Sequence, residues 1–308
     1  MAISTKNLYK KYGSRFVLEN LFLNVEKGSI YGFLGRNGAG KTTTIKLLSG
    51  LSTPTQGQIF VDGMDLSSES GKVKQILGLV PQDSGFYDER TALSHMVYYG
   101  RLKCLSKKES LEQSRVLLDQ VGLGNEMFKK VGYFSHGMKT RLGIAQALLN
   151  NPEVLILDEP TNGLDPVGIR QIRQILRECN NNGITIFLSS HNLLEIQEIC
   201  TYVGILDKGK LIAESTIEKI CHLESNGVIT VGVYNLSSEM VSLIESLKFV
   251  VKTELKAEHI LEIFVNSRTD VKPEINRLIV ENGGQVFKLI ENSLSLEDAF
   301  FDVTRIKL

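Results

Sequence analysis

Long apolar runs are missing from this chain of 308 residues. None approaches the roughly 18 consecutive apolar residues that a membrane-spanning helix needs. The N-terminus, residues 1–6, also lacks the long apolar core of a secretory signal peptide. We therefore expect a soluble, intracellular protein, and its length favours two domains over one.

Cysteine is scarce, and neither sign of charge is in excess. The four cysteines contain no Cys-x-x-Cys pair: Cys104, Cys179, Cys200 and Cys221. Their spacing makes a zinc site improbable and indicates thiols in a reducing compartment. The 35 basic residues balance the 35 acidic residues, so no overall field favours nucleic acid, and we expect no nucleic-acid partner.

The strongest motif in the sequence is a glycine-rich stretch at residues 35–43. It fits the template G-x-x-x-x-G-K-[ST], between an apolar run at 29–34, predicted to be a strand, and a predicted helix at 44–48. Small residues let backbone N–H groups point at an anion, and the helix start adds partial positive charge. Lys41 can then reach the outer phosphates, and the hydroxyl of Thr42 can bind Mg²⁺. The stretch predicts binding of a nucleoside triphosphate by the following residues: Gly35, Asn37, Gly38, Ala39, Gly40, Lys41, Thr42 and Thr43.

Two adjacent carboxylates follow the apolar run 154–157. This pattern predicts a central parallel strand whose end delivers acidic groups to a crevice. Asp158 can hold Mg²⁺ through water, and Glu159 can accept a proton from an attacking water. Two carboxylates at a buried strand end are costly unless a cation compensates them, which disfavours a purely structural role.

Two other residues give weak signals when each is considered alone. Tyr12 lies beside Gly13 and could stack on an adenine, although a tyrosine near a turn is usually part of the packing. Gln82 follows the predicted strand at 76–80 and could bind Mg²⁺ or position water, although polar residues commonly end strands. The meaning of both depends on their neighbours.

A helix start and a second strand end complete the candidate site. Ser135 can cap a helix whose start Gly137 leaves open to a ligand, although this is also an ordinary helix start. His191 ends the predicted strand 183–191, which should neighbour the acidic strand. Most single histidines are structural, but at this place we expect a phosphate contact.

Together, and in this order, the motifs resemble the nucleotide-binding subunit of an ABC transporter. The resemblance covers about residues 1–218 and implies ATP and Mg²⁺ as ligands. It assigns Tyr12 to adenine stacking, 35–43 to the Walker A loop, Gln82 to the Q-loop, 135–138 to the signature, 154–159 to Walker B, 163–165 with Asp165 to the D-loop, and His191 to the H-loop.

The resemblance further implies a head-to-tail homodimer with ATP at the interface. Each ATP would lie between the Walker A loop of one chain and Ser135 and Gly137 of the other. The implied catalytic residues are Glu159, His191, Gln82 and Lys41, and the implied magnesium ligands are Thr42, Gln82 and Asp158.

The signature departs from the usual family motif. The family has Leu-Ser-Gly-Gly-Gln, whereas His136 and Met138 here replace a glycine and the glutamine. Ser135 and Gly137, the implied γ-phosphate contacts, are kept. We expect a working signature with altered hydrolysis or partner preference.

The residues around the motifs resemble one branch of the family in particular. Segments 31–40, 137–145 and 158–166 look like the bacitracin-resistance and lantibiotic-immunity branch of bacterial exporters, whose ATPase and membrane polypeptides are separate. This implies an integral membrane permease as partner, a location at the cytoplasmic face of the cell membrane, and export of an antimicrobial peptide or drug. A non-transport ABC ATPase, and a sensing or immunity complex without true transport, stay open as alternatives. A P-loop kinase or GTPase would need none of the signature, Q-loop or H-loop residues.

We therefore predict an α/β fold of the P-loop NTPase class, with a RecA-like core in a domain of residues 1–218. An antiparallel β-layer at 1–28 and a helical subdomain at about 84–150 belong to it. Residues 219–308 form a second domain, whose β-α-β-β-α-β pattern is typical of a small ferredoxin-like α+β unit, followed by a last helix from 295–298. For this domain, a dimer-stabilising or regulatory role and a simple folding cap are both open.

Overall fold

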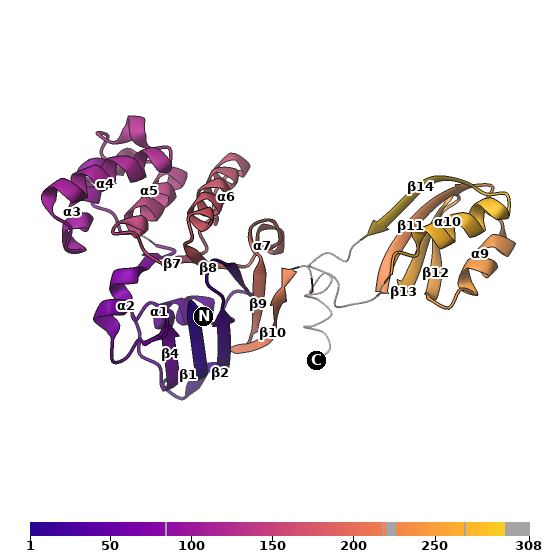
Figure 1. Cartoon of the computed structure of the whole chain (residues 1–308), viewed down its shortest axis with the longest axis horizontal. Helices are drawn as coiled ribbons and strands as arrows, with labels where there is room; N and C mark the ends of the chain where they lie inside the picture. The colour runs from indigo at the N-terminus through magenta and orange to yellow at the C-terminus, as the bar shows by residue number, and fades with distance from the viewer. Residues whose placement is uncertain (84, 218, 220–225, 268, 293–308) are drawn as a thin grey trace. The chain divides into compact units, whose positions relative to one another are not determined.

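The computed structural model describes residues 1–83, 85–217, 219, 226–267 and 269–292. It divides into two compact units, Met1–Ser215 and Thr216–Leu308 (Figure 1). Within the described ranges, no helix is both long enough and apolar enough to cross a membrane. The last helix, predicted from 295–298, lies outside the described residues.

A six-stranded sheet forms the centre of the first unit, in the order β10-β9-β3-β8-β7-β6. The strands are β3 (Ile30–Leu34), β6 (Leu77–Val80), β7 (Val154–Asp158), β8 (Thr185–Ser190), β9 (Tyr202–Asp207) and β10 (Lys210–Thr216). From β9 to β6 the neighbours pair in parallel. Strands β3, β7 and β8 are buried along their whole length, which explains their nearly continuous apolar sequences. The predicted strands are confirmed.

The register of these strands brings their carboxyl ends together. Leu34 of β3 is opposite Ser190 of β8, and Asp158 of β7 is opposite Ser189. The segments that follow β3, β7 and β8 therefore leave the sheet at one edge. All three carry residues of the candidate site.

An antiparallel sheet, in the order β2-β1-β4-β5, lies at the start of the first unit. Its strands are β1 (Ile3–Tyr12), β2 (Arg15–Val25), β4 (Gln56–Val61) and β5 (Met64–Asp65). The predicted antiparallel β-layer is confirmed, and it extends past residue 28 to include β4 and β5. Its buried side chains share one apolar core with Phe33 and Phe187 of the parallel sheet, whose rings lie 5.3 Å apart.

Eight-residue helix α1 (Lys41–Leu48) follows the glycine-rich stretch, and three more helices belong to the sheet-bearing part of the unit: α2 (Ser70–Ile76), α6 (Pro166–Asn181) and α7 (Leu193–Ile199). The expectation that the first helix starts at residue 44 is wrong, because the helix begins at Lys41. Gly40 takes a left-handed conformation there and forms its N-cap. Lys41, Thr42 and Thr43 are therefore helical residues at a helix start.

A helical lobe, which we define as α3 (Ala92–Leu102), α4 (Lys107–Gln120) and α5 (His136–Leu148), forms the remainder of the first unit (Figure 1). The predicted capping box of α4 is confirmed. The Ser106 hydroxyl accepts from the Glu109 N–H at 3.2 Å, and the Ser106 N–H donates to the Glu109 carboxylate at 2.7 Å.

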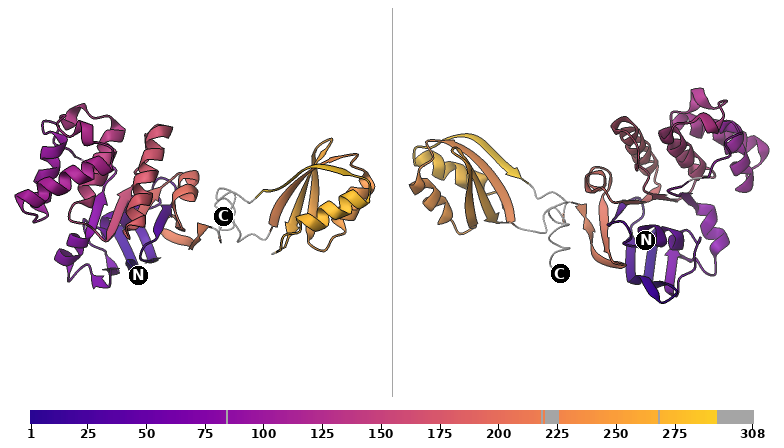
Figure 2. Two further views of the ribbon diagram at one scale, coloured as in Figure 1. Left: turned by 45° about the horizontal axis from the view of Figure 1, so that its top comes forward. Right: turned by 180° about the vertical axis from the view of Figure 1, so that it is seen from behind.

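The second unit has the predicted order β-α-β-β-α-β. It comprises β11 (Asn226–Tyr234), α9 (Ser238–Glu245), β12 (Val250–Ala257), β13 (Ile260–Asn266), α10 (Lys272–Glu281) and β14 (Gln285–Asn292). The strands form one antiparallel sheet in the order β12-β13-β11-β14. Both helices cover one face of it (Figure 2), where Met240, Ile244, Ile275 and Ile279 join the buried core.

Candidate active site

The glycine-rich loop lies close to neighbouring strands at Gly35 and at Gly40. A Cβ atom on Gly35 would lie 2.5 Å from the carbonyl oxygen of Leu206, and one on Gly40 would lie 2.8 Å from Leu18 Cδ2. Gly40 also has a φ of 116°, a conformation that side-chain-bearing residues rarely adopt. Both positions therefore favour glycine, because the loop backbone lies close to Leu206 of β9 and Leu18 of β2. The unpaired N–H groups of the first turn of α1 then favour an anion.

Lys41 lies buried at the start of α1. Its ammonium group donates to the carbonyl oxygen of Gly35 at 2.7 Å and pairs with Glu159 Oε1 at 3.1 Å. The side chains of Lys41 and Glu159 are only 6% and 8% exposed, so solvent screens the pair weakly.

Glu159 lies in an unusual backbone conformation, directly after β7. Its φ of 52° is uncommon for a residue with a side chain, and such outliers cluster at functional sites. Its Oε2 atom lies 2.5 Å from His191 Nδ1. Because a carboxylate can only accept, His191 donates from Nδ1, and Glu159 is held between Lys41 and His191.

Ser189 supports both acidic residues, and sequence reasoning missed it. Its hydroxyl donates to Asp158 Oδ1 at 2.7 Å and accepts from the backbone N–H of Glu159 at 3.0 Å. Ser189 is fully buried in β8. A polar residue at the end of an otherwise apolar strand was the available signal, but its partner follows only from the pairing of Asp158 with Ser189.

Glu195 is a second residue that the sequence analysis did not single out. This buried carboxylate at the start of α7 accepts from the hydroxyl of Thr161 at 2.5 Å and from that of Ser190 at 3.1 Å. It thereby ties the turn after Glu159 to the end of the strand that leads into His191. The arrangement limits how far the two functional segments can move apart.

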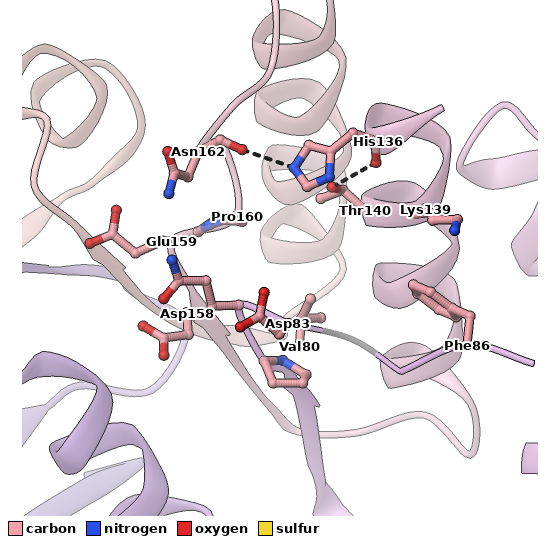
Figure 3. Close-up of a pocket in the computed structure, with 12 residues that line it drawn as sticks. Val80, Asp83, Phe86, His136, Lys139, Thr140, Asp158, Glu159, Pro160 and Asn162 are labelled. Carbon is pink, nitrogen blue, oxygen red and sulfur yellow. Dashed lines mark hydrogen bonds between the residues drawn. The ribbon is translucent and has the colours of Figure 1, made fainter. Parts of the chain in front are cut away.

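Two adjoining cavities open at this edge of the sheet. One, of about 390 Å³, is lined by Val17, Asn37, Gly38, Gly40, Lys41, Thr42, Thr43, Gln82, Glu159, Asn162 and His191. The other, of about 260 Å³, is lined by Val80, Pro81, Gln82, Asp83, Phe86, His136, Lys139, Thr140, Asp158, Glu159, Pro160 and Asn162 (Figure 3). The predicted catalytic residues therefore converge, and Val17 joins them without having been predicted.

The remaining predicted site residues lie elsewhere. Tyr12, at the end of β1, is 51% exposed and lines neither cavity, and the Lys10 ammonium lies 4.9 Å from its ring centroid. Ser135 caps α5 by accepting from the Met138 N–H at 3.3 Å, and Asp165 caps α6 by accepting from the Gly168 N–H at 2.7 Å. The chain does not bring these residues to its own glycine-rich loop.

The predicted magnesium ligands form a chemically suitable set. Thr42 and Gln82 line the larger cavity, and Asp158 lines the smaller one, which Gln82 also borders. A hydroxyl, an amide oxygen and one carboxylate are the hard oxygen donors with which Mg²⁺ combines phosphate oxygens and water. The residues present fit that ion.

Comparison with known proteins agrees with this fold. A family model described as ABC transporter matches residues 18–162. The bacitracin transport ATP-binding protein BcrA of Bacillus licheniformis is 40% identical over 301 residues, which are 97% of this chain and 95% of that protein. The lantibiotic transport ATP-binding protein SrtF of Streptococcus pyogenes is 38% identical and covers 72% of this chain and 94% of its own length.

A solved structure gives the same result for the fold. A dimeric ATP-binding cassette in a post-hydrolysis state, bound to ADP and phosphate, aligns with a TM-score of 0.64 at 26% identity, over 70% of this chain and 98% of that one. The chain belongs to the ATP-binding proteins of ABC transporters. It is an ATPase subunit of the branch that includes bacitracin and lantibiotic transport proteins, and the predicted resemblance, fold class and ATPase activity are confirmed.

Proposed function

We propose that this chain powers an exporter that protects a cell from bacitracin-like or lantibiotic-like peptides. The observation that carries the proposal is the similarity to the bacitracin transport protein over 97% of this chain. That span exceeds the cassette alone and therefore includes the second unit of this chain.

The geometry around Lys41 supports separate catalytic roles for Lys41, Glu159 and His191. With ATP present, the Lys41 ammonium exchanges its contact with Glu159 for a contact with the outer phosphates. The N–H groups at the N-terminus of α1 also bind these phosphates. Glu159 is then free to accept the proton of the water that attacks the γ-phosphorus, while the bond to the β-phosphate oxygen breaks. His191 donates to Glu159 in the structure, and we assign it to steadying the γ-phosphate.

The implied magnesium ion has candidate ligands at the same place. Thr42, Gln82 and Asp158 would hold Mg²⁺, which neutralises phosphate charge when bound. Ser189 keeps the Asp158 carboxylate oriented by donating to its Oδ1 atom.

The positions of Ser135 and Gly137 support a homodimer. Both lie at the start of α5, Ser135 is exposed, and neither lines the cavity beside the glycine-rich loop of its own chain. A second copy placed head to tail would receive them at its nucleotide, completing two sites at one interface.

A groove on the helical lobe supports a membrane permease as partner. It has a volume of about 420 Å³ and is lined by Arg90, Thr91, Leu93, Ser94, Val97, Tyr98, Leu111 and Phe128. Phe128 is 71% exposed, and the Arg90 guanidinium stacks 4.4 Å from the Tyr98 ring centroid. Exposed aromatic and arginine side chains are typical anchors of protein interfaces. We assign this groove to a cytoplasmic segment of the permease, and we propose that the chain works at the cytoplasmic face of the membrane.

The proposal is tested by a growth assay. The chain and its genuine membrane partner are expressed in a susceptible host, as wild type or with Glu159→Gln, and challenged with bacitracin, several lantibiotics and unrelated drugs. We expect wild type alone to raise the inhibitory concentration of one peptide class. A wild-type pair that hydrolyses ATP yet protects against no peptide would contradict the export of such peptides. The Glu69→Gln variant, at a half-buried carboxylate away from both cavities, serves as the charge-matched control.

A further inference from the structure

His136 connects the first turn of α5 to the turn that follows the catalytic glutamate. Its Nε2 atom lies 3.0 Å from the carbonyl oxygen of Asn162 (Figure 3). Because a carbonyl oxygen only accepts, the imidazole donates from Nε2. The hydroxyl of Thr140 donates to the carbonyl oxygen of His136 at 3.1 Å, so the residue is also tied into its own helix.

Asn162 belongs to a turn that begins at Glu159. The N–H of Asn162 donates to the carbonyl oxygen of Glu159 at 3.1 Å, and the N–H of Glu159 is in turn held by Ser189. Two hydrogen bonds therefore lead from the imidazole of His136 to the backbone of Glu159. The path contains no long flexible side chain.

The same two segments also lie close together at Gly163 and Gly137. A Cβ atom on Gly163 would lie 3.6 Å from His136 Nε2, and one on Gly137 would lie 3.6 Å from Leu164 Cδ2. The start of α5 therefore lies close to the turn at 163–164 as well as being hydrogen-bonded to it, with room for little more than a methyl group between them.

We propose that His136 is a positioning residue that couples the two ATP sites of the dimer through a single chain. The inference rests on the proposed head-to-tail dimer, in which Ser135 and Gly137 meet the partner's ATP while Glu159 serves the chain's own ATP. His136 stands between Ser135 and Gly137 in the sequence. Its side chain is hydrogen-bonded to Asn162, in the turn that begins at Glu159. Glycine, the usual residue at this position of the motif, has no side chain with which to make this link.

The link makes hydrolysis at one site depend on occupancy of the other. Because His136 holds the Asn162 carbonyl, ordering of the first turn of α5 by the partner's ATP also reaches the turn that carries Glu159. Loss of the donor should therefore reduce turnover and the cooperativity between sites, whereas binding of ATP to the chain's own glycine-rich loop should be unaffected.

Three variants of the full chain test the proposal. His136→Gln keeps an amide donor near the position of Nε2, His136→Phe fills the volume of the ring without a donor, and His136→Gly restores the usual motif. We expect the Phe and Gly variants to lose about tenfold in kcat and their Hill coefficient for ATP to fall from about 2 towards about 1. His136→Gln should stay close to wild type, and single-site ATP binding, measured by nucleotide fluorescence on dilute protein, should be equal in all four proteins.

The possible outcomes distinguish failure of the coupling through His136 from failure of the proposed dimer on which it rests. His136→Phe with wild-type kcat and Hill coefficient would overturn the coupling, and so would His136→Gln behaving like His136→Phe. Thermal unfolding of each variant checks that the fold is intact. If Glu159→Gln protein does not dimerise with ATP in sedimentation experiments, the proposed dimer itself is wrong, and the coupling falls with it.

Discussion

The contact between Lys41 and Glu159 predicts that Glu159→Gln binds ATP more tightly than wild type. At 3.1 Å, two unit charges attract by about 5 kcal/mol at an effective dielectric constant of about 20. In the absence of nucleotide this attraction holds Lys41 on the carboxylate, so the phosphates of ATP must compete for it. Glutamine removes the charge but keeps an amide oxygen that still accepts a hydrogen bond, and the two effects partly offset each other.

We expect a net gain of about 1–2 kcal/mol in ATP binding, which is about a 5- to 30-fold lower Kd. The same variant should lose about 10²- to 10⁴-fold in turnover, because the amide cannot accept the proton of the attacking water. Isothermal titration calorimetry with dilute protein gives the Kd, and phosphate release gives the rate. Glu69→Gln, which removes a half-buried carboxylate paired with the exposed Lys72, should change neither. Equal or weaker ATP binding by Glu159→Gln would refute the competition, and a wild-type rate would refute the role of Glu159 as base.

Two further predictions concern Ser189, which supports both acidic residues, and Lys103 of the segment after α3. Ser189→Ala leaves Asp158 Oδ1 and the Glu159 N–H without their buried partner. We expect it to lower the free energy of unfolding, measured by urea denaturation, by about 1–3 kcal/mol and to lower kcat roughly tenfold. Unchanged stability and rate would show that the hydroxyl is dispensable. Burial lowers the pKa of Lys103 from 10.5 to about 8, so the unfolded chain binds the additional proton between these values and the free energy of unfolding should rise with pH through that window. Urea titrations from pH 8 to 10 measure this rise, and Lys103→Met should flatten it; equal slopes in the two proteins would contradict the assignment.

Local spacing determined much of this protein. The template at 35–43 required only a strand before it and a helix after it, and both are local patterns of apolar residues. The capping box at Ser106 and Glu109 is likewise complete within four consecutive residues. The β-α-β-β-α-β order of the second unit followed from alternating and helical apolar periods along the chain. Such features could be predicted because the interacting residues are neighbours in sequence.

Tertiary structure alone decided how the segments at the sheet edge meet. Ser189 reaches Asp158 because β7 and β8 pair in one particular register, and a shift by one residue would turn the serine to the other face. His136 meets Asn162 because the start of α5 packs against a turn 26 residues away, a contact that no local pattern encodes. Tyr12, chosen for its sequence context, lies outside both cavities. Sequence determines which chemical groups each segment carries, whereas strand register and helix packing decide which of those groups touch.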